Sequence, residues 1–300
     1  MLQLLAFTTL LSFSNTAHAA PEFKCDSYNS PMLEKNVRFC TQRSRPASKQ
    51  KAGEPVVYVM HGVFGNALGW VGGGYAEALD LLGANEKVPP FTIVSFDTSG
   101  TSFFSDVGTE HAGTASYETW FITEFIPYIE STRNLCRERS CRSLVGISMG
   151  GYGALKTGLK YPDLFHAVAA RSPALIDMNP YDSLKSWKEY FARHPISVAH
   201  GMALLFRARS IFTSREYFER NNPFKLVREI PAEKIPELYI DVGGRDFYGF
   251  QEGFFKFMRE LAERGKKVTS TYLDAGSHDM DMERRWAVLD FVSKNLISSQ

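Results

Sequence analysis

Short apolar runs alternate with longer amphipathic stretches along most of this chain. The runs are rich in β-branched and aromatic residues, and they are shorter than an average helix, so they favour strands. Unbroken apolar runs of this length are typical of strands buried on both faces of a parallel sheet. Strands are predicted at residues 56–60, 91–96, 142–147, 165–170, 237–242 and 267–273, after an extended segment at 30–39.

The stretches between these runs have the spacing of helices with one apolar face. Strands that alternate with helices predict a mostly parallel sheet with helices on both faces. This alternation stops at residues 177–228, where charged and aromatic residues predict two or three helices inserted over the sheet as a cap. Because the sheet needs the strands on both sides of this insert, we expect a single α/β domain at residues 20–300. The other helices are predicted at residues 67–82, 117–132, 149–159, 250–264 and 282–295.

The beginning of the chain has a different character from the rest. An apolar run at residues 2–13 is followed by Ala17-His18-Ala19, which matches a small-residue cleavage site. This pattern predicts a secretory signal peptide at residues 1–19 and a secreted or periplasmic protein. The alternative, a membrane anchor, requires about 20 apolar residues, and the run is too short. No other segment is long and apolar enough to span a bilayer, so we expect no transmembrane segment.

The net charge of +1 gives no indication of a nucleic-acid or membrane-surface partner. The chain has four cysteines, Cys25, Cys40, Cys136 and Cys141. An even number behind a signal peptide favours disulfides, and proximity pairs Cys25 with Cys40 and Cys136 with Cys141. A metal site is the alternative, but no histidine lies at ligand spacing beside either pair. Buried free thiols are the third reading if the protein is not exported.

A Gly-x-Ser-x-Gly motif follows the strand predicted at residues 142–147. Its serine is Ser148, between Gly146 and Gly150. A serine hydroxyl is a weak nucleophile unless it is exposed and paired with a base. A sharp turn from strand to helix exposes the hydroxyl, and the two glycines let the backbone pass closely. We therefore predict that Ser148 is a nucleophile, with an ordinary glycine-serine turn as the alternative.

Two later strands are followed by residues that can activate this serine. Asp246 comes after the strand at residues 237–242, and His278 comes after the strand at 267–273. Functional groups gather at the carboxyl ends of parallel strands, and Ser, Asp, His is the chain order of α/β-hydrolase triads. We predict that His278 is the general base and that Asp246 orients it. Asp241 is the competing acid, but it falls inside the strand and is expected to bond locally.

An acyl-transfer site also needs donors for an oxyanion and walls for the substrate. Met149, directly after Ser148, is predicted to give one backbone N–H. The second is predicted from Val63, with Phe64 as the alternative, unless residues 61–65 form a plain glycine-rich loop. Aromatic pocket walls suit an apolar acyl group, although the same rings can simply pack the cap onto the sheet. These predicted substrate-binding residues are Phe64, Trp70, Phe103 and Phe104.

The insert is also rich in basic residues, which hint at an anionic portion of the substrate. Solvated helix faces carry similar residues, so this pattern alone does not decide the point. The basic side chains are Lys185, Lys188, Arg193, Arg207, Arg209, Arg215, Arg220 and Arg228.

Together these motifs resemble the esterase D, or "putative esterase", family of α/β-hydrolases. That group includes S-formylglutathione hydrolases, feruloyl and acetyl-xylan esterases, enterochelin esterases and mycolyltransferases. The matching segments are His61-Gly62, Phe96-Asp97, residues 124–129, residues 146–151, Asp241-x-Gly243-x-x-Asp246, and Gly276-Ser277-His278-Asp279 with Trp286.

The resemblance implies an α/β-hydrolase fold and serine-dependent acyl transfer without a metal or an organic cofactor. It also implies that His61 supports the oxyanion loop. This chain departs from the family in two respects. The formylglutathione hydrolases are cytosolic, whereas this chain has a predicted signal peptide and paired cysteines. Its insert is also larger than is expected for a compact member. The substrate of a relative therefore cannot be transferred to this protein.

The function expected from these residues is an exported serine carboxylesterase that works through an acyl-enzyme. Its substrate would be a small-molecule or glycan-linked ester. An acyltransferase that uses the same residues to move the acyl group to an alcohol or sugar is the alternative. A non-catalytic binding protein on this scaffold would lack the nucleophile or the base, and both are present here. The sequence does not indicate an oligomeric state.

Overall fold

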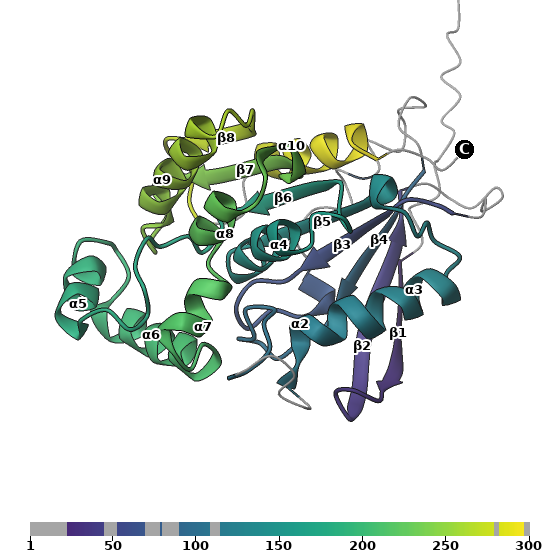
Figure 1. The fold of residues 1–300 in the computed structure, drawn as a ribbon, viewed down its shortest axis with the longest axis horizontal. Coiled ribbons are helices and arrows are strands. Elements are labelled where there is room, and N and C mark those ends of the chain that lie inside the picture. The colour runs from purple at the N-terminus through teal and green to yellow at the C-terminus, as the bar shows by residue number, and fades with distance from the viewer. Residues whose placement is uncertain are drawn as a thin grey trace, which may run out of the picture.

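The computed structural model describes residues 23–44, 53–69, 79, 90–108, 115–278 and 282–296. The predicted signal peptide, Trp70 and most of the predicted helix at 67–82 lie outside these residues. An eight-stranded sheet with the order β1-β2-β4-β3-β5-β6-β7-β8 forms the centre of the molecule (Figure 1). Neighbouring strands pair in parallel from β4 to β8, while β2 pairs antiparallel with both β4 and β1. The strands are β1 (Phe23–Ser30), β2 (Lys35–Arg43), β3 (Val56–Met60), β4 (Thr92–Phe96), β5 (Arg142–Ile147), β6 (Ala167–Arg171), β7 (Glu237–Gly243) and β8 (Thr269–Leu273).

The N-terminal hairpin is the part of the sheet that the sequence pattern misplaced. One extended segment was expected at residues 30–39, and the structure has two strands joined by a turn. Most β1 residues are exposed, so this edge strand has no apolar run that could signal it. Cys25 and Cys40 lie opposite each other in this hairpin and form a disulfide, and Cys136 and Cys141 form a second one.

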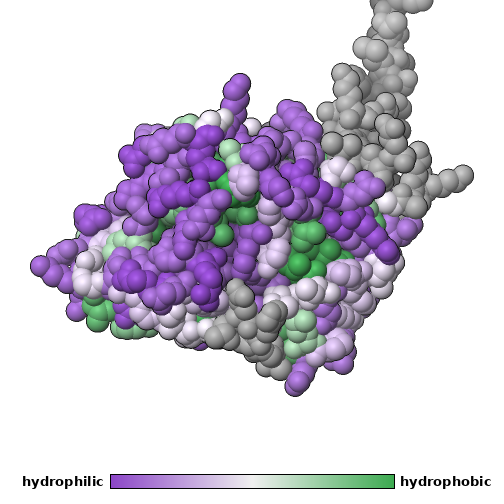
Figure 2. Space-filling view, viewed as in Figure 1, coloured by the Kyte–Doolittle hydropathy of each residue, from purple (hydrophilic) through white to green (hydrophobic). Residues whose placement is uncertain are grey.

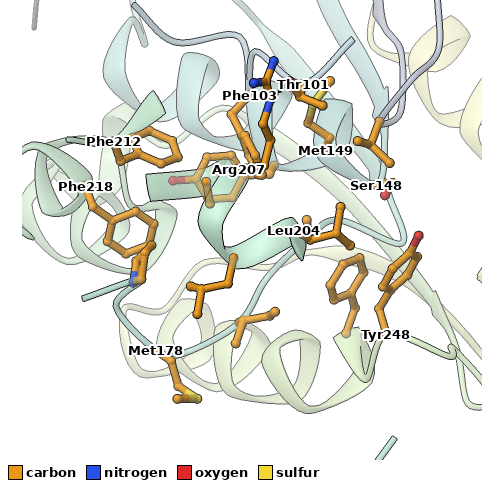
Figure 3. Close-up of a pocket in the computed structure, with 18 of the residues that line it drawn as sticks. Thr101, Phe103, Ser148, Met149, Met178, Leu204, Arg207, Phe212, Phe218 and Tyr248 are labelled. Atoms are coloured by element: carbon orange, nitrogen blue, oxygen red, sulfur yellow. Dashed lines mark hydrogen bonds between the residues drawn. The ribbon is translucent and has the colours of Figure 1, made fainter. Parts of the chain in front are cut away.

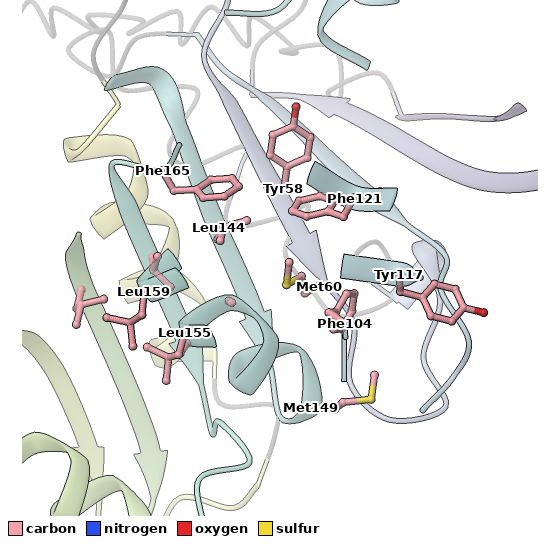
Figure 4. Packing of buried hydrophobic residues seen from close by; sticks show 14 of the residues in the cluster. Tyr58, Met60, Phe104, Tyr117, Phe121, Leu144, Met149, Leu155, Leu159 and Phe165 are labelled. Carbon is pink, nitrogen blue, oxygen red and sulfur yellow. The ribbon is translucent and has the colours of Figure 1, made fainter. Parts of the chain in front are cut away.

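Successive strand residues point to opposite faces of the sheet, and the two faces bury different helices. Tyr58 and Leu144 belong to the larger core (Figure 4), which helices α2, α3, α4, α8 and α9 cover. Val57 and Val145 point the other way and pack against α10. The helices are α2 (Tyr117–Trp120), α3 (Ile126–Thr132), α4 (Met149–Lys160), α5 (Leu184–Ala192), α6 (Val198–Ile211), α7 (Arg215–Arg220), α8 (Pro223–Glu229), α9 (Phe250–Glu263) and α10 (Met282–Lys294). Shorter helical turns are π-helical Phe121–Phe125, between α2 and α3, and 3-10 turns at Arg139–Cys141 and Ala232–Lys234.

Between β6 and β7 the chain forms four helices, where the sequence predicted two or three. Polar caps divide them: Ser183, Ser197, Ser214 and Asn222 each accept a hydrogen bond from a backbone N–H in the first turn. Helices α5, α6 and α7 group together to one side of the sheet (Figure 1), and we call these three helices the helical insert. Helix α8 instead packs on α4 and α9 as part of the main layer.

The face of the molecule that carries α2–α4, α8 and α9 is mostly hydrophilic, with small separate hydrophobic areas (Figure 2). Within the described ranges, no helix has both the length and the apolar character that crossing a bilayer requires.

Candidate active site

Ser148 lies at a strained turn between β5, in the middle of the sheet, and α4. Its backbone has φ 57° and ψ −118°, a conformation that L-residues rarely adopt. A Cβ on Gly146 would lie 2.0 Å from the carbonyl oxygen of Gly150, and one on Gly150 would lie 2.0 Å from that of Met60. The two glycines therefore let α4 approach both β5 and the end of β3.

His278 and Asp246 meet at the ends of β8 and β7. The imidazole Nδ1 lies 2.8 Å from the Asp246 Oδ2, and Asp246 Oδ1 accepts the N–H of Tyr248 at 2.9 Å. An Nδ1–H that donates to the carboxylate leaves Nε2 as the acceptor of the ring. The rings of Phe247, Tyr248 and Phe250 pack around the imidazole, with centroids 4.7 to 5.4 Å away. The structure thus pairs His278 with Asp246.

Asp241 bonds locally, away from His278. Its buried carboxylate accepts a hydrogen bond from Arg284 at 3.2 Å and lies 3.5 Å from Arg171 Nε. Burial raises the pKa of Asp241, and the two guanidinium groups oppose that shift. Arg284, which sequence reasoning did not single out, also donates to the Ser277 carbonyl at 2.8 Å. It therefore ties α10 to the loop that carries His278. The sequence signal for this role is weak: Arg284 is a basic residue in a predicted helix that must bury one of its faces.

His61 connects two loops beside the turn that carries Ser148. Its Nδ1 donates to the carbonyl of Gly62 at 2.8 Å, because Nε2 accepts from the Thr98 backbone N–H at 3.4 Å. The Thr98 hydroxyl lies 3.0 Å from the same Nε2. Burial lowers the pKa of His61, which favours this neutral ring.

The next residues bear on the two predicted oxyanion donors. The N–H of Phe64 donates to Gly100 at 2.6 Å, so that group is already committed. For Val63 and Met149, no partner of the backbone N–H is found among the described residues. Both residues line the same cavity as Ser148. The geometry therefore favours Val63 over Phe64 as the second donor.

A cavity of about 900 Å³, open mouth included, extends from Ser148 under the helical insert (Figure 3). Ser148 and Met149 lie at one end, and the rings of Phe212 and Phe218 lie at the other. Aliphatic and aromatic side chains form nearly all of the wall. The lining residues are Val63, Thr101, Phe103, Ser148, Met149, Tyr152, Ala174, Ile176, Met178, Pro180, Trp187, Phe191, Leu204, Leu205, Arg207, Ala208, Phe212, Phe218, Tyr248 and Phe250.

The four predicted pocket walls have different positions. Phe103 lines the cavity. Phe64 is 74% exposed and lines a separate surface groove. Phe104 does not line the cavity, which corrects that prediction: its ring is buried in the main core against Phe96 (Figure 4). Trp70 lies outside the described residues.

Phe103 and Phe104 both have positive φ, at 50° and 51°. A buried cation holds this strained pair: Lys156 of α4 donates to the Phe104 carbonyl, to the Ser105 hydroxyl at 2.9 Å and to the Glu118 carboxylate at 2.5 Å. Burial alone would raise the pKa of Glu118, but the ammonium groups of Lys156 and Lys160 outweigh it and lower the pKa to about 2. Sequence reasoning missed Lys156, because a lysine in a helix is usually exposed.

In the part of the chain that the structure describes, no group of three histidine, cysteine, aspartate or glutamate side chains is arranged to hold a metal ion. Three features define the class of this protein. The sheet is mostly parallel, a strained serine lies at its central strand-to-helix turn, and a histidine–aspartate pair lies at neighbouring strand ends. This combination is that of an α/β-hydrolase of the serine hydrolase class.

Comparison with known proteins narrows this class. Residues 38–295 match the family described as "Putative esterase", and the chain belongs to that esterase family. An acetyl esterase of Caldicellulosiruptor saccharolyticus is 27% identical over 235 residues, which cover 77% of this chain and 79% of that protein. A solved ferulic acid esterase superposes with a TM-score of 0.70 at 23% identity, over 92% of this chain and 100% of the other.

An esterase of Mycobacterium tuberculosis is 30% identical over 123 residues, or 39% of this chain. The match covers 25% of the mycobacterial protein, so the chain spans about a quarter of that relative's length.

Proposed function

We propose that this protein is an exported carboxylesterase that hydrolyses its substrate through an acyl-enzyme on Ser148. The observation that carries the proposal is the 2.8 Å bond between His278 and Asp246. The rings of Tyr248 and Phe250 contact His278 and line the same cavity as the strained Ser148. Family membership supports esterase activity, and the geometry supports the assignment of roles.

In this mechanism, Nε2 of His278 takes the proton of the Ser148 hydroxyl as the oxygen attacks the ester carbonyl. The carbonyl oxygen becomes an oxyanion, which the N–H groups of Met149 and Val63 stabilise. Asp246 holds the imidazole by its Nδ1–H and stabilises the positive charge that forms on the ring. The protonated His278 then gives its proton to the leaving alcohol, and the acyl group stays on Ser148.

The same groups act again in the second half of the reaction. His278 accepts a proton from water, the water oxygen attacks the acyl carbonyl, and the proton returns to the Ser148 oxygen as the acid leaves. An alcohol or sugar in place of water would give acyl transfer instead of hydrolysis. Product analysis with added alcohol acceptors separates the two outcomes.

Labelling with a fluorophosphonate tests the nucleophile directly. The folded protein is expected to gain one adduct that peptide mass spectrometry places on Ser148, and Ser148→Ala is expected to gain none. Ser131→Ala, on the exposed side of α3, is the matched control and should be labelled as the wild type is. Absence of an adduct on the folded wild type would contradict the proposal.

Export rests on the signal-peptide pattern and on the two disulfides, which persist in oxidising compartments. Expression of the full sequence in a secreting bacterial host should release a chain that begins at residue 20 or 21. Intact-mass measurement of the extracytoplasmic fraction tests this. A full-length chain confined to the cytoplasm would contradict export without affecting the proposal for Ser148.

A further inference from the structure

Among the described residues that line the cavity, one side chain carries a charge. Arg207, on α6, faces the cavity from above its middle, between Ser148 and the far aromatic end (Figure 3). Its Nε donates to the Thr101 hydroxyl at 2.6 Å, which fixes the plane of the guanidinium. No carboxylate among the described residues forms an ion pair with Arg207. Its two terminal nitrogens are therefore available to a ligand.

Arg207 also belongs to a second hollow. A surface groove lined by Phe64, Gly100, Thr101, His200, Ala203, Leu204 and Arg207 adjoins the cavity. Thr101, Leu204 and Arg207 line both hollows, so they form the boundary between them. No acidic side chain lines either hollow within the described part of the chain. The guanidinium of Arg207 thus places a positive charge between the apolar cavity and the open groove.

We propose that this protein selects esters in which an apolar acyl group is joined to an alcohol that carries a carboxylate or a phosphate. This inference rests on the proposed function. The acyl group occupies the apolar cavity, and the alcohol lies in the groove with its anion on Arg207. Guanidinium groups bind planar carboxylates and phosphates through paired N–H donors, and Thr101 already fixes the orientation of this one. Arg207 is then a specificity-determining residue.

Three aryl esters with the same butyryl group test this. 4-(Butyryloxy)benzamide is the neutral reference, 4-(butyryloxy)benzoate carries a carboxylate and 4-(butyryloxy)phenyl phosphate carries a phosphate. We expect kcat/KM for at least one anionic ester to exceed that of the amide about tenfold. The carboxylate and phosphate arms show which anion the site prefers.

The ratio of anionic to neutral kcat/KM is then measured in variants, because a ratio cancels damage to the shared chemistry. Arg207→Gln should lower the ratio about tenfold, while Arg207→Lys should retain part of it. Arg209→Gln is the matched control, since Arg209 lies on the same helix but binds the carbonyls of Pro180 and Asp182. It should keep the wild-type ratio. Added salt should reduce the ratio of the wild type.

Three results would overturn the inference: equal kcat/KM for charged and neutral esters, a preference that survives Arg207→Gln, or a stronger preference for charge on the acyl side. Comparing 4-nitrophenyl hemisuccinate with 4-nitrophenyl butyrate measures the last of these. If the neutral ester is hydrolysed at Ser148 without a charge preference, only this inference fails. If no ester is hydrolysed and Ser148 is not labelled, the proposed function fails as well.

Discussion

The two sides of the cavity are built in different ways. On the sheet side, backbone packing and buried ion pairs fix Ser148, His278 and the loop of Phe103. The helical insert, on the other side, packs through two small clusters, one around Phe212, which includes Tyr152 of α4, and one around Trp187. Tyrosine hydroxyls join it to the sheet side: Tyr190 donates to the Tyr248 carbonyl at 3.0 Å, and Tyr217 to that of Asp106 at 2.7 Å.

This difference assigns separate tasks to the two sides. Groups that would perform chemistry lie where a shift of 1 Å is costly, and they are held by a large continuous core. Side chains that would select the substrate lie on helices of the insert, whose clusters are small and separate from the main core. Substitutions on the sheet side should therefore change turnover or global stability, whereas substitutions in the insert should change which ester is preferred.

The largest effect is expected from Asp246→Asn. The asparagine keeps the size of the side chain but removes the charge that orients and stabilises the imidazole, so kcat should fall by about 10³–10⁴. Ester hydrolysis under saturating substrate measures this. The melting temperature should stay near the wild-type value.

Asp241→Asn is the contrast to that variant. It removes the carboxylate beside the buried Arg171 and Arg284, and the free energy of unfolding should drop by about 3–5 kcal/mol. A variant at Asp246 that unfolded while Asp241→Asn lost only turnover would reverse the two assignments.

Glu118→Gln should remove a pH dependence of stability. The pKa of Glu118 is about 2 in the folded protein, below the ordinary value of 4.5. Its ionised form therefore stabilises the fold above pH 4.5, and this stabilisation is lost as the pH falls toward 2. The gap in unfolding free energy between wild type and Glu118→Gln should be on the order of 1–3 kcal/mol at pH 6 and should narrow toward pH 3. Urea titrations at both values measure it.

The exposed Glu233 provides the control for that experiment, and Glu233→Gln should leave the curve of the wild type unchanged. A constant gap between pH 6 and pH 3 would show that the pair of Glu118 and Lys156 does not contribute through ionisation.

Phe212→Ala should lengthen the far end of the cavity. We expect the ratio of kcat/KM for decanoyl over butyryl esters to rise several-fold, because a methylene in an apolar pocket is worth about 1 kcal/mol. Phe255→Ala, a truncation of a ring that is 53% exposed outside the cavity, is the control and should not alter the ratio. An equal change in both variants would exclude the cavity as the acyl site.

Tyr190→Phe should have the smallest effect. It removes one hydrogen bond between the insert and the sheet side, worth about 1 kcal/mol. Hydrogen exchange should become faster in α5 and α6 and stay unchanged in β5 and α4. Uniform acceleration throughout the domain would show that the insert and the sheet unfold together.

The sequence predicted the sheet side of the molecule more closely than the insert. Buried parallel strands leave apolar runs, and the residues that follow them fall at one edge of the sheet, which is why His278 and Asp246 could be paired in advance. Strand β1 was missed because its side chains are exposed and polar. The sequence could not distinguish Phe103 from Phe104, because they are adjacent residues of the same type. Both have positive φ in the structure, but the ring of Phe103 lines the cavity and that of Phe104 is buried in the main core.

The basic residues of the insert show a second limit. Eight cations were candidates for binding an anion, and their sequence positions are equivalent in kind. Only the position of α6 beside the cavity shows that Arg207 lines the cavity while Arg209 is occupied by backbone carbonyls. Which face of a helix meets a ligand depends on tertiary packing, and periodicity alone does not encode it.

The hairpin of β1 and β2 has a practical consequence for handling the protein. It forms the outer edge of the sheet, where β4 and β3 separate it from β5, and the Cys25–Cys40 disulfide closes it. Selective opening of this disulfide would loosen the margin and leave the packing around β5 in place, whereas the second disulfide, Cys136–Cys141, directly precedes β5. An activity assay therefore reports on the middle of the sheet and does not detect changes at its edge. A sample with an opened, aggregation-prone edge can pass such an assay, and storage stability is better judged from light scattering than from turnover.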